Sequence, residues 1–289
     1  MPNSLMGELQ RALRAITGTA QSYQGDWHAY LDSRGFPAGQ WDARVLRFRQ
    51  SNSPETGTAA AAHNWFLTNG PTYTVSPYGY NMTASGDYFS TSNAVANQIT
   101  GNITLIIECS LNDWTPASVE TLVAKDNLGV GGRSYAVNIQ TSGNPRLNYS
   151  LDGTAIVSVT ASAPMPIADG ISIHLAVERE SATGKVRFYT SKDHVEWTQL
   201  GTEQTGTSGT IFAGSADLQF GNLAASSYAL NGKVYASEIY TGLAISSPSG
   251  AVLKVDFDPL QWTSGATWTS TKTGEVWTIN GNALIYKAS

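Results

Sequence analysis

Between residues 103 and 243, apolar residues recur at every second position in short runs separated by small polar residues. In 171–178, for example, Ile173, Leu175 and Val177 alternate with polar or small residues. A period of two places successive side chains on opposite faces of a strand, so each run predicts a β-strand with one buried face. The runs that predict strands are 103–111, 121–125, 135–140, 147–151, 156–159, 171–178, 186–190, 195–200, 218–220 and 232–240.

Turn residues separate these runs. The sequence Ser-Ala-Thr-Gly at 181–184 ends in a glycine that can adopt positive φ, which predicts a hairpin between 171–178 and 186–190. Many short strands at this spacing are typical of two packed sheets. A content of 28 glycines, 13 tyrosines and 8 tryptophans fits a chain rich in strands and turns. We therefore expect a mainly β protein built as a β-sandwich.

The first 50 residues follow a helical period instead. Leu5, Leu9 and Leu13 share one face of a helix, and two further short helices are expected at 27–35 and 40–50. Residues 51–63 are small, polar and alanine-rich, which predicts a linker. The expected organisation is a helical docking segment at 1–50, a linker at 51–63 and a sandwich at 64–289. The last part, 251–289, would supply C-terminal hairpin strands.

The helical segment carries a net charge of +2 and the remainder −7. Three short helices cannot bury all of their aromatic side chains by themselves, so they need the sandwich or another chain. Tryptophan at the centre of an interface with arginine at its rim is a common binding pattern. We therefore expect this segment to bind a partner; a solvated arginine face and tryptophans packed on the chain's own sandwich are the alternatives. The expected partner-binding residues are Trp27, Trp41, Arg44, Arg47 and Phe48.

Several stretches resemble, in order, the strands of the concanavalin A-like, laminin G-like jelly-roll family. They are 86–91, 102–111, 120–127, 134–153, 171–200, 218–223 and 230–243, and the resemblance covers about residues 65–245. The family includes lectins, adhesins, glycosidases and structural modules, so the fold alone does not determine function. Two further stretches resemble bacteriophage virion proteins: the helical sequence at 26–48 and TGEVWTINGNALI at 273–285.

These resemblances imply a phage virion structural protein, such as a head decoration, collar or tail appendage. It would be made in the host cytoplasm, bind other virion proteins through its N-terminal helices, and display the sandwich, with a homo-oligomer as one arrangement. The alternative is a carbohydrate-binding adhesin that recognises host surface glycans. Trp114 and Tyr228 lie in predicted loops and are the candidate aromatic platforms for a glycan.

A glycoside hydrolase is a third, disfavoured hypothesis, because such enzymes need two carboxyl groups across a cleft. The Glu-x-Asp-x-x-Glu pattern of the jelly-roll glucanases is absent. The nearest pattern, Glu178-Arg179-Glu180, is expected to be a set of exposed charges at a strand end. The sequence therefore predicts a protein that is not an enzyme.

Other residue types narrow the ligand classes. Histidines are scattered without metal spacing, and no cofactor is expected, although Asp87, Asp126 and Asp152 are loop acids that could bind calcium. Cys109 is in phase with Ile107 and predicts a buried thiol. A net charge of −5 argues against nucleic-acid binding. No apolar run reaches membrane-spanning length and no signal peptide is recognisable, so we expect no membrane insertion.

Overall fold

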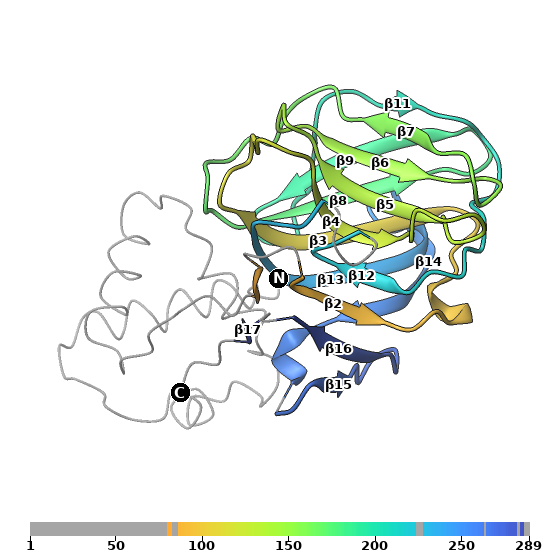
Figure 1. Cartoon of the computed structure of the whole chain (residues 1–289). Helices are drawn as coiled ribbons and strands as arrows, with labels where there is room; N and C mark the ends of the chain where they lie inside the picture. Colours follow the sequence, from red (N-terminus) through yellow and green to blue (C-terminus); the bar gives the residue numbers. More distant parts are fainter. Residues whose placement is uncertain (1–79, 83–85, 224–227, 263, 282–283, 286–289) are drawn as a thin grey trace, which may run out of the picture. The chain divides into compact units, whose positions relative to one another are not determined.

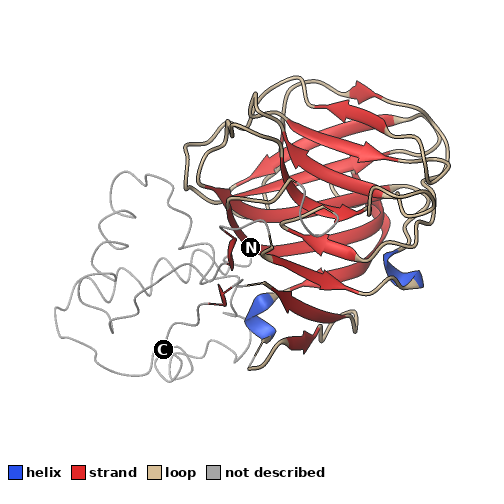
Figure 2. Cartoon of the chain, viewed as in Figure 1, coloured by secondary structure: helices blue, strands red, loops and turns tan. Residues whose placement is uncertain are grey.

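The computed structural model describes residues 80–82, 86–223, 228–262, 264–281 and 284–285, which all belong to one compact unit spanning 76–287. These residues form two antiparallel sheets that pack face to face (Figure 1, Figure 2). The mainly β jelly-roll sandwich expected from the sequence is confirmed. The predicted helical segment 1–50 and linker 51–63 lie outside the described residues, and so do the five predicted partner-binding residues.

Sheet A contains nine strands among the described residues. Its order is β10-β9-β8-β3-β13-β1-β17, with β11 also paired to β9 and β14 also paired to β13. Its strands are β1 (Tyr80–Met82), β3 (Ile103–Leu111), β8 (Ile173–Arg179), β9 (Lys185–Ser191), β10 (Thr198–Gln199), β11 (Gln204–Thr205), β13 (Gly232–Leu243), β14 (Ser247–Phe257) and β17 (Leu284–Ile285).

Sheet B contains eight strands in the same described part of the chain, in the order β15-β16-β2-β12-β4-β5-β6-β7. They are β2 (Tyr88–Thr91), β4 (Glu120–Lys125), β5 (Tyr135–Ile139), β6 (Pro145–Tyr149), β7 (Val157–Thr160), β12 (Leu218–Phe220), β15 (Thr267–Thr269) and β16 (Val276–Asn280). Two short 3₁₀ helices, η1 (Val95–Asn97) and η2 (Pro259–Gln261), lie in connections. No helix of the described residues is long and apolar enough to cross a membrane.

The hydrophobic core lies between the sheets and uses the alternate residues that the sequence pattern indicates. Leu175 and Val177 of β8 and Leu105 of β3 are completely buried there. Cys109 is buried in the same core, where loss of solvation raises the pKa of its thiol far above the ordinary value. The predicted hairpin at 181–184 also forms, with Gly184 at φ 75°. The periodicity therefore identified most of the strands and their buried faces.

An aromatic cluster occupies one part of this core. Phe257 of β14 contacts Phe89, Phe220, Trp268 and Trp277, with ring centroids 4.7–5.6 Å apart. These partners come from β2, β12, β15 and β16 of sheet B. Residues from 251 onward therefore contribute side chains to the sandwich core as well as strands to both sheets.

The predicted strand at 195–200 is wrong over most of its length, since β10 contains only Thr198–Gln199. The carboxylate of Asp193 accepts hydrogen bonds from the backbone N–H groups of Val195 and Glu196, both at 2.9 Å. His194 adopts φ 63°, in the left-handed region. Such an Asx turn uses backbone donors that a strand would need, so the side chain of Asp193 competes with the sheet.

The prediction of exposed charges at the end of β8 is also wrong. Glu178 and Arg179 are completely buried, and only Glu180 is partly exposed. Arg179 points into the sandwich, where its guanidinium lies 4.1 Å from the ring centroid of Tyr149 and donates to the carbonyls of Thr207 and Gly209. Glu178 faces the other side of the sheet and accepts hydrogen bonds from a turn at 245–246. Both charges are therefore structural.

Candidate functional site

The outer face of sheet B carries polar side chains at positions that alternate with core residues. In β5, Val137 and Ile139 are buried in the core, so Asn138 projects from the opposite face. In β6, Leu147 and Tyr149 are in the core, so Arg146 and Asn148 project outward. The sequence runs AVNI and PRLNY thus place amides and one guanidinium on a single outer surface.

The strand register brings these residues together across the sheet. One row joins Thr121, Asn138, Arg146 and Thr160 as successive cross-strand partners. A parallel row joins Gln219, Ala124, Ala136, Asn148 and Ser158. Cross-strand neighbours are close enough for their side chains to interact. We call the polar members of these two central rows the amide face: Thr121, Asn138, Arg146, Asn148, Ser158, Thr160 and Gln219.

Hydrogen bonds run through the amide face as a continuous series. Ser158 Oγ donates to Asn148 Oδ1 at 2.8 Å, and Asn148 Nδ2 donates to Asn138 Oδ1 at 2.9 Å. Asn138 Nδ2 in turn donates to Thr121 Oγ1 at 2.8 Å. Asn138 and Thr121 are buried, whereas Asn148 is half-buried and Ser158 exposed. The buried members therefore fix the orientation of the accessible amide of Asn148.

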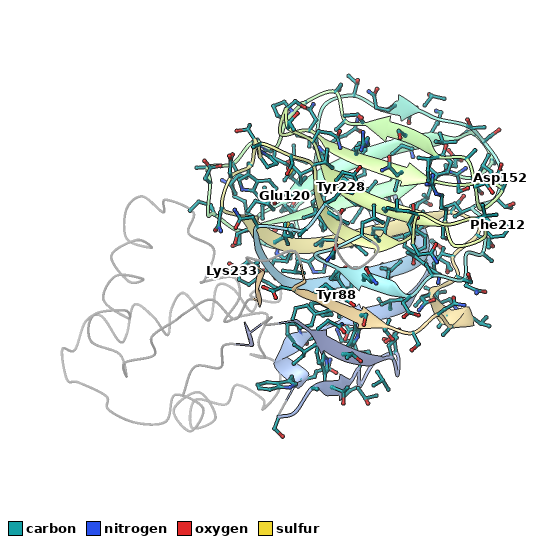
Figure 3. The ribbon with its side chains drawn as sticks, in the orientation of Figure 1. Tyr88, Glu120, Asp152, Phe212, Tyr228 and Lys233 are labelled. Carbon is teal, nitrogen blue, oxygen red and sulfur yellow. The ribbon has the colours of Figure 1, made fainter. Side chains whose placement is uncertain are left out.

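Tyr228 lies at the edge of the amide face. Its carbonyl accepts a hydrogen bond from the Thr121 N–H at 2.8 Å, and its side chain is near enough to Arg146 to influence the pKa of that guanidinium. The residue is 49% exposed and has φ 58°, although it is not glycine. A left-handed conformation costs a bulky residue about 1–3 kcal/mol and is found preferentially at functional sites. In Figure 3, Tyr228 lies close to Glu120, over the part of the sandwich that β4 and β5 form.

Arg146 is the charged member of the amide face. It is half-buried, and its Nε is buried without a hydrogen-bond partner in the structure. Partial loss of solvation lowers the pKa of the guanidinium, and Tyr228 partly opposes that change. Arg146 forms no salt bridge within the described part of the chain. Among the described residues, its positive charge therefore has no neutralising carboxylate.

Glu120 lies at the beginning of β4, next to Thr121. Only 6% of it is exposed, and burial raises the pKa of its carboxyl group to about 7. The backbone N–H of Asn231 donates to its Oε2 at 3.0 Å and opposes that rise, while the charge of Asp113 adds to it. This end of the sheet therefore has a carboxyl group that titrates near neutral pH.

The two predicted glycan-platform residues have different environments. Trp114 is 3% exposed and packs in the main core, with its backbone N–H bonded to Asp169 Oδ1 at 2.8 Å. Its ring is therefore buried in this structure, whereas a glycan platform needs an accessible ring. Tyr228, in contrast, is accessible and lies beside the amide face. Its role in glycan binding stays a prediction.

The predicted calcium candidates do not form a common site. Asp87 and Asp126 are buried, and Asp126 accepts the N–H of Leu128. Asp152 is exposed and accepts the N–H groups of Thr154 and Ala155, as expected for a residue that stabilises a turn. Within the described residues, no group of three or more histidine, cysteine, aspartate or glutamate side chains could hold a metal ion.

The outer face of sheet A carries a different cluster. His174 of β8 stacks on His194 with ring centroids 5.1 Å apart, and Trp197 contacts both imidazoles edge-on. His194 Nε2 lies 3.5 Å from the carboxylate of Glu238. These rings pack against one another, which accounts for the outward-facing histidine of β8 without a ligand.

No protein-family model matches this chain, and no curated protein matches it. Among solved structures, it is similar to a candidate carbohydrate-binding protein from Bacteroides ovatus ATCC 8483, with a TM-score of 0.50 and 13% identity; the match covers 72% of this chain and 59% of that one. It is also similar to the CBM40 of the Ruminococcus gnavus IT-sialidase bound to alpha2,3 sialyllactose (TM-score 0.44, 10% identity, 60% and 93% covered). A third is mouse laminin alpha1 chain, domains LG4-5 (TM-score 0.41, 13% identity, 64% and 47% covered). At 13% identity, the first likeness shows the fold alone.

Proposed function

We propose that this protein binds a carbohydrate through the amide face of sheet B. The observation that carries the proposal is the hydrogen-bond series that orients Asn148 from the buried Asn138. A sugar hydroxyl both donates and accepts, and an amide side chain offers both functions within one rigid group. A preoriented amide loses little rotational freedom on binding, so more of the interaction energy contributes to affinity.

Tyr228 adds the aromatic surface that such a site needs. Its ring is half exposed beside the amides, and the strained backbone indicates that the surrounding structure holds it in that position. A tyrosine ring offers an apolar face to the C–H groups of a sugar and a hydroxyl for hydrogen bonding. The fold similarity to a candidate carbohydrate-binding protein supports the same proposal.

The favoured hypothesis from the sequence, a virion structural protein anchored by residues 1–50, depends on a resemblance and stays a prediction. The carbohydrate-binding alternative is better supported because accessible, preorganised polar groups lie on one face of the sandwich. Binding at this face involves no catalytic step, and the absence of enzymatic activity also stays a prediction.

An array of neutral and acidic oligosaccharides, followed by calorimetry on the best ligand, tests this function. Asn148→Ala and Tyr228→Ala should each reduce affinity about tenfold or more, the equivalent of about 1.4 kcal/mol. Asn280→Ala and Tyr88→Ala are the matched controls. Both control residues lie on the outer face of sheet B. Asn280, like Asn148, forms a hydrogen bond with a serine side chain, although here the amide is the donor: Asn280 Nδ2 donates to Ser90 Oγ at 2.9 Å.

The controls should bind as the wild type does, because β2 and β16 are separated from β5 by β12 and β4. If the Asn148→Ala and Asn280→Ala variants bind the oligosaccharide with equal affinity, the amide face is not the binding site. Failure of the folded wild-type protein to bind any oligosaccharide on the array would refute the function itself.

A further inference from the structure

Resting on the proposed function, we infer that the ligand is an acidic sugar whose carboxylate is bound by Arg146. The first observation is the charge of the amide face. The outward positions of its two central rows are occupied by threonine, serine, alanine, asparagine, glutamine and Arg146. Arg146 is the charged side chain in these rows, so a ligand that lies across them encounters one fixed positive charge.

The guanidinium of Arg146 is half-buried and has no neutralising carboxylate among the described residues. Its Nε is buried without a hydrogen-bond partner. Its two terminal nitrogens donate to no described residue, and they are not buried. The two other arginines that lie on outer surfaces of the described sandwich do have partners. Arg187 Nη2 lies 2.7 Å from Glu203, and Arg133 donates to the carbonyl of Leu128. Arg146 therefore differs in having terminal N–H donors that no described residue accepts.

A half-buried guanidinium is costly unless it is paired, because burial disfavours the charged form. The lowered pKa of Arg146 has that same cause. A carboxylate matches the fork of the two terminal N–H groups and can bind it in a bidentate manner. The neutral amides on either side then bind ring hydroxyls, so the face as a whole fits a sugar that carries one carboxylate.

The charge of the whole chain points the same way. With a net charge of −5, the protein does not attract anions in general, and the chain after residue 50 is more acidic than the N-terminal segment. Selectivity for an acidic sugar must then come from a local cation. Tyr228, whose carbonyl accepts the Thr121 N–H at the edge of this face, offers a half-exposed ring for the sugar to stack on.

The test uses the full chain and matched oligosaccharides. Tri-galacturonic acid and 3′-sialyllactose are each compared with the same compound after reduction of the carboxylate to a primary alcohol, and a 6-sulfated galactose trisaccharide is the third arm. The wild type should bind at least one acidic member about tenfold or more tightly than its reduced form. Arg146→Gln should abolish that preference while it retains affinity for the reduced form. Arg187→Gln, on the opposite sheet, is the control and should retain the preference.

Each other result is decisive. If the wild type binds acidic and reduced forms equally, or if Arg146→Gln leaves the preference intact, the acidic-sugar inference is wrong while carbohydrate binding stands. A preference for the sulfated trisaccharide over both carboxylated sugars would contradict the inference that Arg146 binds a carboxylate. It would identify a sulfate ester as the bound group. Absence of binding to every sugar, with a folded protein by circular dichroism, would remove the proposed function together with this inference.

Discussion

The carboxylate of Glu178 accepts a hydrogen bond from Ser246 Oγ at 2.6 Å, although the two residues lie 68 positions apart in the chain. The backbone N–H groups of Ile245 and Ser246 donate to the same carboxylate at 2.7 and 3.2 Å, and Thr104 Oγ1 at 3.3 Å. Glu178 therefore fixes the turn between β13 and β14 on the outer face of sheet A.

This arrangement predicts that Glu178→Gln destabilises the protein. The amide NH₂ of glutamine would face donors, so at least one buried hydrogen bond is lost at a cost of about 1–3 kcal/mol. The free energy of unfolding, measured by urea denaturation, should fall by that amount.

Glu180→Gln is the matched control. Glu180 is partly exposed, and its carboxylate accepts a hydrogen bond from Thr183 Oγ1 at 2.8 Å. Its replacement should change the free energy of unfolding by less than about 0.5 kcal/mol. Equal losses in the two variants would show that the interactions of Glu178 are not what stabilises this turn.

The central hairpin of sheet A gives a second prediction. Phe188 is completely buried opposite Val177, so Phe188→Ala should cost about 3–5 kcal/mol. Arg187 projects to the other face and pairs with Glu203, which is partly exposed, so Arg187→Ala should cost at most about 1 kcal/mol. Thermal and urea denaturation measure both. Similar losses in the two variants would contradict the assignment of faces in β9.

Glu120 predicts a pH dependence of stability. Its pKa is about 7 in the folded protein against an ordinary value of 4.5, so between these values the folded chain retains a proton that the unfolded chain has lost. The free energy of unfolding should therefore fall as pH rises from 4.5 to 7, by up to about 3 kcal/mol from this group. Urea denaturation at pH 5 and pH 8 measures the difference.

Glu120→Gln separates this effect from other titrations. Glutamine can still accept the Asn231 N–H but does not ionise, so the stability of the variant should exceed that of the wild type at pH 8 and approach it at pH 5. If the free energy of unfolding of the variant changes between pH 5 and pH 8 as much as that of the wild type, Glu120 is not the source of the pH dependence.

The strands of the amide face were predictable from the sequence, but the complete face was not. Alternation places Asn138 and Asn148 opposite the core residues of β5 and β6, which are joined in a local hairpin. Arg146 precedes the predicted strand 147–151, whereas β6 begins at Pro145, so its place on this face was not predicted. Gln219 reaches the same face because β12 pairs with β4, a contact between segments nearly 100 residues apart. Local patterns do not determine such long-range pairing, and a one-residue shift would reverse every side chain.

The loop aromatics show a second limit. Trp114 and Tyr228 both lie in predicted loops, yet one is in the core and the other is half exposed. The difference arises from partners distant in sequence: Asp169 holds the backbone of Trp114, and Thr121 holds that of Tyr228. Likewise, Glu178 was expected at an exposed strand end because the turn at 245–246 that covers it cannot be inferred from its neighbours.

The strained backbone of Tyr228 predicts a separation of stability from binding. Tyr228→Gly relieves the left-handed φ of 58°, and this relief should offset the removal of a ring that is already 49% exposed. The free energy of unfolding should therefore change by less than about 1 kcal/mol, whereas oligosaccharide affinity should fall at least tenfold because the ring is gone.

Leu128→Gly is the matched control, since Leu128 has φ 62° and is 42% exposed in the loop between β4 and β5. It should show the same small effect on stability with unchanged affinity. Denaturation and calorimetry on both variants would decide the matter. A large loss of stability in Tyr228→Gly alone would show that the tyrosine supports the fold, and unchanged affinity would exclude its ring from the binding site.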